Sequence, residues 1–378
     1  MSSVEEFRAE IRGWLKTHLS GSFAALKGRG GPGREHEAFA ERLAWERHLA
    51  AHGWTCVGWP EKYGGRGASI EEQIAFHEEY ALADAPARVN HIGEQLLGPT
   101  LIDHGTEEQK ARFLPPIRAV EELWCQGYSE PGAGSDLAAV RTRAALEDGR
   151  WVVDGQKIWT SLAHESQWCF VLARTEPGSR RHAGLSYLLV PLDRPGVEIR
   201  PIVQLTGTSE FNEVFFDGAV TDAANVVGAP GDGWRIAMAT LGYERGVSTL
   251  GQQVGFRREL DALVALARRN GAAADPDIRD RLTRAWAGLE ALRAGALRGT
   301  DPSAAKLYWS HWHRDLGELA LEVCGPAATL AAGAPYELDD WQRLFLFSRA
   351  DTVYAGSSEI QRNIIAERVL GLPKEPRP

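Results

Sequence analysis

The 378-residue sequence has few sulfur-containing residues, with four cysteines and two methionines. Cys56, Cys125, Cys169 and Cys324 are far apart and include no CxxC pair. This spacing predicts neither a cysteine zinc site nor a disulfide framework. We expect these cysteines to be small hydrophobic residues in the interior.

The sequence also lacks a basic surplus and a long apolar run. Lys and Arg number 42 and Asp and Glu number 51, which gives a net charge of −9. This balance argues against a protein that binds nucleic-acid phosphates. No apolar run reaches the roughly 18 residues that a membrane-spanning helix needs. The amino terminus is charged and amphipathic and has no apolar signal core, so we expect a cytoplasmic protein.

The hydrophobic pattern predicts an α+β fold with three domains. Residues 1–120 show helical spacing of apolar residues. Residues 121–228 contain short β-branched and aromatic runs bounded by Gly, Pro and Asp, typical of an antiparallel β-barrel or sandwich. Helical spacing returns in residues 229–378.

Two helices can be placed from local signals. One begins at Thr106, which forms a capping-box pattern with Gln109, and is expected to end before Pro115. The other is a single long helix from Trp234 to about Arg269.

A glycine-rich segment, EPGAGSD (residues 130–136), could be mistaken for a dinucleotide-binding fingerprint. Leu137 occupies the third glycine position, however, and polar residues and a strand follow where a helix is required, so the Rossmann interpretation fails. A purely structural turn and a turn that offers backbone N–H groups to a ligand both remain open, with Ser129 and Ser135 at the edges.

Other candidate residues each have an ordinary structural explanation beside a functional one. Trp159, near Ser161, could stack on a flat ring or simply pack in the core. Glu244, before Arg245, could be a desolvated base or part of an exposed ion pair. The eleven histidines are scattered, so no metal site is predicted.

Five segments in the same order resemble the acyl-CoA dehydrogenase family over almost the whole chain. They are GTEEQK (105–110), YSEPGAGSD (128–136), DGQKIW (154–159), GDGW (231–234) and YAGSSEIQR (354–362). The resemblance implies an N-terminal helical domain, a middle β domain and a C-terminal four-helix bundle. It also implies FAD, with the isoalloxazine held between the β domain and the bundle.

Residue roles carry over from this resemblance by position. The residues implied to bind the cofactor are Gln126, Tyr128, Ser129, Ser135, Trp159 and Ser161 around the ring, with Ser357 and Glu359 at the adenosine portion. Ser135 is also implied to lie near the substrate.

The catalytic base differs from that of most family members. The usual glutamate of the Tyr-Glu-Gly turn is Ala355 here. A branch that includes isovaleryl-CoA dehydrogenase-like enzymes carries the base on the long helix before an arginine, which corresponds to Glu244 and Arg245. We expect Glu244 to remove the α-proton of a thioester while hydride passes to flavin N5, Arg245 to orient the site, and the Ala355 N–H to bond the thioester oxygen.

Two segments depart from the family pattern, and they leave the assembly open. In the family pattern, an arginine after the long helix reaches a neighbouring subunit's FAD, and its nearest counterpart here is Arg269. The family's Gln-x-x-Gly-Gly segment reads EVCGP (322–326) in this chain. A homodimer or homotetramer acting on an acyl-CoA or acyl-carrier thioester, with electron-transfer flavoprotein as acceptor, is expected. A heterotetramer with a non-catalytic or half-site subunit, and a flavin monooxygenase or nitroalkane-oxidase relative, are the alternatives.

Overall fold

The computed structural model describes residues 3–244, 248–333 and 336–374. Contacts divide the chain into two units, one of residues 1–204 and 208–246 and the other of residues 205–207 and 247–378. None of the described helices is long and apolar enough to cross a bilayer. The order of helices, sheet and helices confirms the predicted fold class, and the boundaries at residues 120 and 228 stay predictions.

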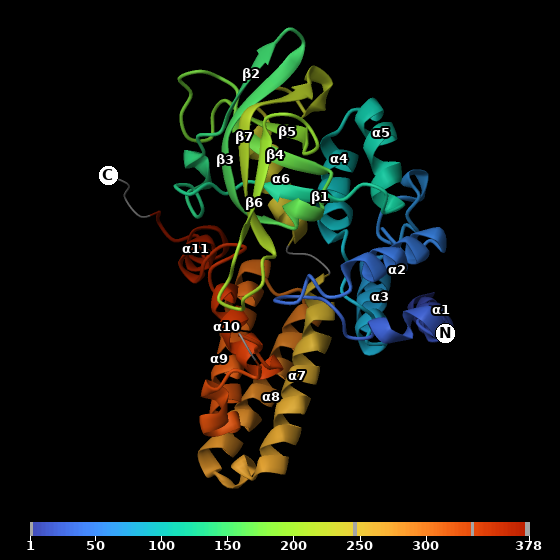
Figure 1. Ribbon diagram of the computed structural model, residues 1–378, viewed down its shortest axis with the longest axis vertical. Helices are drawn as coiled ribbons and strands as arrows, with labels where there is room; N and C mark the ends of the chain where they lie inside the picture. The colour runs from blue at the N-terminus through green and yellow to red at the C-terminus, as the bar shows by residue number, and fades with distance from the viewer. Residues whose placement is uncertain (1–2, 245–247, 334–335, 375–378) are drawn as a thin grey trace. The chain divides into compact units, whose positions relative to one another are not determined.

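The amino-terminal helices belong to the first unit (Figure 1). They are α1 (Ser3–His18), α2 (Phe39–Ala51), α3 (Ile70–Leu82), α4 (Gly98–His104) and α5 (Glu107–Arg118), with a π-helical turn at Gly93–Leu97 before α4. The capping box of Thr106 and Gln109 is confirmed. The predicted end before Pro115 is wrong, because α5 continues to Arg118. Ile117 is fully buried in the core, and this packing holds the last turn in place.

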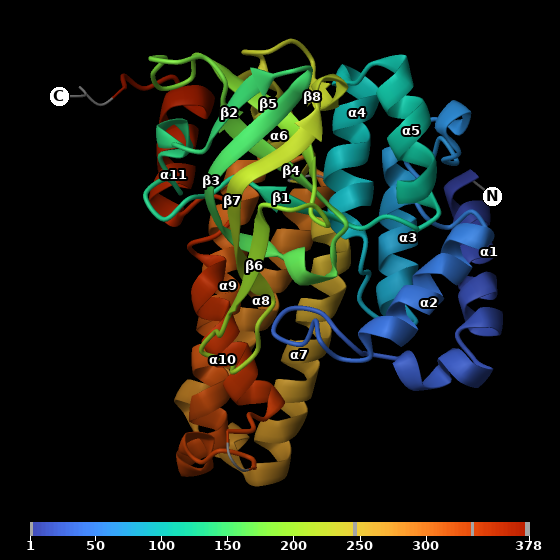
Figure 2. The ribbon, with the colours of Figure 1, turned by 45° about the horizontal axis from the view of Figure 1, so that its top comes forward.

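The middle of the chain forms one eight-stranded sheet (Figure 2). Its strands are β1 (Trp124–Gly127), β2 (Arg143–Glu147), β3 (Arg150–Ser161), β4 (Trp168–Arg174), β5 (Leu185–Pro191), β6 (Val197–Ile202), β7 (Phe211–Asp222) and β8 (Val226–Val227). Pairing is antiparallel except for the parallel pairs β1–β4 and β2–β4. All seven residues of β5 are buried, since apolar side chains cover both faces of the sheet there.

Helix α6 (Gly233–Glu244) packs on β5 and belongs to the first unit. The second unit contains α7 (Ser248–Asn270), α8 (Pro276–Leu297), α9 (Pro302–Cys324), α10 (Asp340–Asp351) and α11 (Ser358–Ile364). Helices α7 to α10 pack around an apolar core. The long helix predicted from Trp234 is described as α6 and α7, and residues 245–247 lie outside the described residues.

The prediction of interior cysteines is confirmed for three of the four and not for Cys324. All four are free; Cys56, Cys125 and Cys169 are buried and Cys324 is half-buried.

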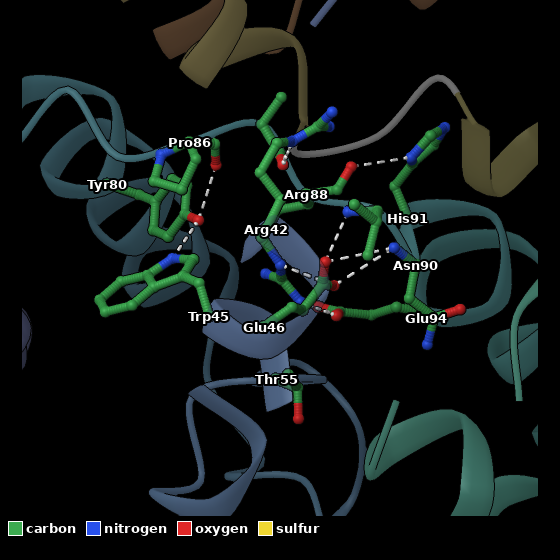
Figure 3. A network of polar contacts seen from close by, with 12 residues as sticks. Arg42, Trp45, Glu46, Thr55, Tyr80, Pro86, Arg88, Asn90, His91 and Glu94 are labelled. Carbon is green, nitrogen blue, oxygen red and sulfur yellow. Dashed lines mark hydrogen bonds and ion pairs between the residues drawn. The ribbon is translucent and has the colours of Figure 1, made fainter. Parts of the chain in front are cut away.

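A buried ion-pair network joins α2 to the chain before α4 (Figure 3). Glu46 of α2 is 1% exposed; its carboxylate accepts hydrogen bonds from Arg88 Nε at 2.8 Å and from the Val89 N–H at 2.5 Å. Arg88 also contacts Glu94 in the π-helical turn. The network fixes the π-helical turn relative to α2, because each charge in it depends on the others for solvation.

We therefore expect Glu46→Gln to destabilise the first unit by about 3 kcal/mol or more, because Arg88 would lose a buried counter-charge. Chemical denaturation followed by tryptophan fluorescence measures the change. Glu41→Gln, on the exposed face of α2, is the matched control and should leave the midpoint unchanged. Equal midpoints for the two variants would contradict a structural role for the network.

Candidate functional site

The glycine-rich segment follows β1 as a tight turn. The Glu130 N–H donates to the Ala133 carbonyl and the Ala133 N–H donates to the Glu130 carbonyl, both at 3.0 Å. Gly127, the last residue of β1, packs closely against β4, where a Cβ would lie only 2.8 Å from Cys169 Sγ. A single 3₁₀ turn (Leu137–Ala139) and then β2 follow the segment, in place of the α-helix that a Rossmann fingerprint requires.

A buried ion pair anchors this turn to β3. The Lys157 ammonium is fully buried and donates to Glu130 Oε1 at 2.8 Å, to the Tyr128 carbonyl at 3.0 Å and to the Leu172 carbonyl at 2.8 Å. Burial raises the pKa of Glu130, but Lys157 and further hydrogen bonds outweigh burial and hold it below its usual value. The pair fixes the start of the turn from inside the protein.

Both carboxylate oxygens of Glu130 also accept hydrogen bonds from the backbone. The Arg141 N–H donates to Oε2 at 2.6 Å and the Thr142 N–H donates to Oε1 at 2.8 Å. Sequence reasoning missed Lys157 as a site residue, and its only local signal was its place in the DGQKIW block.

Trp159 occupies a bulge near the end of β3. The β3–β7 register shifts between Lys157 and Thr160, and Trp159 has a φ of 60°, which is unusual for a bulky residue. Its side chain is 57% exposed, and its ring makes an edge contact with Phe211 at 6.3 Å between centroids. This exposure shows that Trp159 does not pack in the core of the first unit. Bulges of this kind re-aim side chains at binding sites.

The bulge is tied directly to the turn. The Ile158 N–H donates to the Ser129 carbonyl at 2.9 Å, which brings Ser129 beside Trp159. Among the other predicted residues of the first unit, Gln126 and Ser161 are half-buried at the ends of their strands, Tyr128 is buried, and Ser135 is exposed in the turn.

Glu244 is the last residue of α6, and two hydrogen bonds to α4 anchor the end of this helix. Thr240 Oγ1 lies 2.8 Å from Thr100 Oγ1, and the Tyr243 hydroxyl donates to Asp103. The side chain of Glu244 and the whole of Arg245 lie outside the described residues. The structure therefore fixes the position of the Glu244 backbone on an anchored helix.

In the second unit, the segment 354–357 forms a strained turn before α11. Ala355 has a φ of 51°, in the left-handed region. The side-chain amide of Gln361 donates to the Ala355 carbonyl at 3.0 Å, and the Tyr354 hydroxyl donates to Asp351 Oδ1 at 2.6 Å. These bonds hold the turn in a conformation that alanine alone does not favour.

Ser357 is the N-cap of α11, with its Oγ accepting from the Ile360 N–H at 3.4 Å, and Glu359 is exposed in the first turn. Ser358 Oγ and Gln361 Oε1 are buried and have no hydrogen-bond partner among the described residues. A buried polar atom without a partner in the protein can be satisfied by water, an ion or a bound ligand. Arg269 is exposed in the last turn of α7.

A charged cluster supports the same turn from α9. His313 lies between Asp351 Oδ2, 2.5 Å from Nδ1, and Glu259 Oε2, 2.9 Å from Nε2. Burial lowers the pKa of His313, but the bonds to Asp351 and Glu259 outweigh burial and raise it to about 9. Asp351 therefore joins the His313 imidazolium to Tyr354, next to Ala355. No local pattern of residues indicated this cluster.

We expect Lys157→Met to lower the free energy of unfolding by about 3–5 kcal/mol, because Glu130 would remain buried without its counter-charge. Urea denaturation measures the loss. Adding Glu130→Gln to this variant should recover part of it, because the unpaired charge is then removed. Lys16→Met, at an exposed lysine of α1, serves as the control.

The raised pKa of His313 also predicts a pH dependence of stability. A histidine with a folded-state pKa above its unfolded value stabilises the protein fully below about pH 6.5, the unfolded value. That contribution is lost as the pH rises through about 9. Melting temperatures of the wild type should therefore fall over this window, and the fall should be smaller in His313→Gln. His311→Gln, on the same helix, should follow the wild type; parallel curves for all three would contradict the assignment.

Comparison with known proteins agrees with this architecture. Residues 2–121 match the profile described as acyl-CoA dehydrogenase, N-terminal domain, residues 125–219 match the middle domain, and residues 231–370 match the C-terminal domain. The acyl-CoA dehydrogenase IpdE1 of Mycobacterium tuberculosis is 68% identical over 99% of each chain.

Two solved structures are similar over 99% of each chain at 30% sequence identity. They are the Tcur3481-Tcur3483 steroid ACAD, with a TM-score of 0.85, and the ChsE4-ChsE5 complex from Mycobacterium tuberculosis, with a TM-score of 0.82. Together with the three matched domains, these relatives show that the chain belongs to the acyl-CoA dehydrogenase family of flavoprotein oxidoreductases.

Proposed function

We propose that the protein catalyses the FAD-dependent α,β-dehydrogenation of an acyl-CoA thioester and passes the electrons to an electron-transfer flavoprotein. The observation that carries this proposal is the exposed Trp159 at a left-handed bulge, tied to Ser129. A strained, exposed aromatic residue beside hydroxyl groups is suited to a flat, polar-edged ring.

The residues present fit FAD. Trp159 would pack against the ring, with Ser161, Ser129, Gln126 and Tyr128 around it. When bound, the flavin supplies a hydride acceptor at N5. Ser135 would lie near cofactor and substrate.

At the adenosine portion we propose Ser357 and Glu359. Support comes from the neighbouring buried atoms Ser358 Oγ and Gln361 Oε1, which lack partners among the described residues. A bound nucleotide would supply hydrogen bonds to such atoms and so remove their desolvation cost.

We propose Glu244 as the base that removes the α-proton, with Arg245 orienting the site. The anchoring of α6 through Thr240 and Tyr243 supports this role, because a general base must be held within hydrogen-bond reach of the proton. Ala355 has no ionisable side chain, so the position where most family members carry their base cannot perform this step.

Ala355 would instead contribute its backbone N–H. Removal of the α-proton places negative charge on the thioester oxygen, and a preorganised N–H donor stabilises that charge. Gln361 and Tyr354 support this role because their hydrogen bonds fix the turn before any substrate binds.

The substrate class that the comparisons favour is a steroid-derived acyl-CoA, because one similar structure is a steroid ACAD.

The second candidate function is that of one subunit in a heteromeric assembly. The ChsE4-ChsE5 complex is similar over 99% of this chain, and the segments expected to reach a neighbouring subunit's FAD, around Arg269 and residues 322–326, are altered.

The visible spectrum of the purified protein, followed by anaerobic addition of acyl-CoA thioesters, tests the proposed reaction. A flavin spectrum that one thioester bleaches supports it. A protein that remains colourless after reconstitution with FAD contradicts a complete site in this chain alone and favours the half-site alternative.

Glu244→Gln should slow thioester-dependent flavin reduction by about 10²–10⁴-fold, because the glutamine amide cannot accept the proton. Flavin content should be unchanged. Rapid mixing under anaerobic conditions measures the rate. Glu147→Gln, at an exposed position of β2, is the matched control. A Glu244→Gln rate equal to that of the wild type would show that another group is the base.

A further inference from the structure

Three histidines that are separated in sequence meet in the first unit. His18 is the last residue of α1, His48 lies in the last turn of α2, and His52 is the C-cap of α2. One ligand nitrogen of each imidazole lies within 4.8 Å of those of the other two. His18 Nδ1 and His48 Nε2 are only 2.9 Å apart. From this geometry we propose that His18, His48 and His52 form a binding site for a divalent transition metal ion, with zinc as the reference ion.

The spacing of the two α2 histidines suits metal binding. Residues four apart on a helix lie on the same face, so His48 and His52 project side by side. His18 supplies the third ligand from a different helix. A metal bound here would therefore link the end of α1 to the end of α2.

The tautomer of one ligand is already fixed. His52 Nδ1 lies 2.8 Å from the His48 carbonyl, which can only accept a hydrogen bond, so Nδ1 carries the proton and Nε2 keeps its lone pair. A backbone carbonyl on the second ring nitrogen is a common way to orient a metal-binding histidine.

The facing pair of His18 and His48 requires one proton shift. Without metal, one of the two facing nitrogens donates a hydrogen bond to the other. On metal binding, the proton on the donating ring moves to its other nitrogen, so both facing nitrogens present lone pairs. Zinc–nitrogen bonds of about 2.0–2.1 Å in a tetrahedral site require small side-chain rotations from the present geometry.

The cluster is partly shielded from solvent, because His18 and His48 are half-buried. Trp14 covers the cluster, with its ring stacked on His18 at 4.4 Å between centroids. The cluster is therefore covered by an aromatic ring on one side and reaches solvent through His52.

The ligand set indicates the class of metal. Three imidazoles suit zinc, nickel and copper, whereas magnesium and calcium prefer oxygen ligands. His52 is exposed, so a fourth coordination position can be filled from solvent. The site would stabilise the folded first unit, because a metal that binds only the folded state shifts the unfolding equilibrium.

The test uses the full-length protein with any affinity tag removed and with metals stripped by a chelator. Calorimetric titration with zinc chloride should show one equivalent bound with micromolar or tighter affinity, and the melting temperature should rise by several degrees. Magnesium chloride should have no effect. His52→Ala, at an exposed position, should weaken zinc binding at least tenfold without changing the melting temperature of the metal-free protein.

His36→Ala, at an exposed histidine outside the cluster, is the matched control and should bind zinc as the wild type does. The far-ultraviolet circular dichroism of each variant checks that it is folded. Zinc affinity that is only millimolar, or that is the same in His52→Ala and the wild type, would overturn the proposal.

Discussion

The positions of the glycine turn and of β3 in the β domain depend on the buried ion pair of Lys157 and Glu130. Transferring two charges from water to the interior costs several kcal/mol per ion, which only good geometry offsets. Here the Lys157 ammonium donates three hydrogen bonds, and the Glu130 carboxylate also accepts hydrogen bonds from two backbone N–H groups. Because the partners lie in the glycine turn and in β3, the pair holds both segments at once. The strained bulge at Trp159 lies next to this ion pair, so the backbone that carries the exposed ring is held rigidly.

The same physical solution recurs in the second unit. His313 is charged and buried between two carboxylates. One of them, Asp351, also accepts a hydrogen bond from the Tyr354 hydroxyl. In both units a satisfied buried charge therefore supports a backbone segment in a left-handed conformation, Trp159 in one and Ala355 in the other. Such conformations cost about 1–3 kcal/mol each and persist only where the surroundings over-determine them.

Sequence analysis predicted the features that depend on local pattern. The helix–strand–helix order, the capping box at Thr106 and the failure of the Rossmann interpretation follow from spacing of a few residues. The ion pair Lys157–Glu130 joins residues 27 apart, and His313 joins partners 38 and 54 residues away. These pairs depend on tertiary packing, which no local pattern encodes. The continuation of α5 through Pro115 was missed for the same reason, since the burial of Ile117 outweighs the helix-breaking tendency of proline.

In the proposed mechanism, alanine at position 355 would separate two roles, that of a side-chain base and that of a backbone N–H donor. A carboxylate there would act through its side chain, whereas the N–H acts through the backbone and is kept by any residue except proline. The bonds from Gln361 and the support from Asp351 act on the backbone and on Tyr354, not on the side chain of residue 355. Loss of the carboxylate therefore leaves the turn's hydrogen-bond framework unaffected. The proposed base on α6 could then be established independently, because α6 has its own anchors to α4.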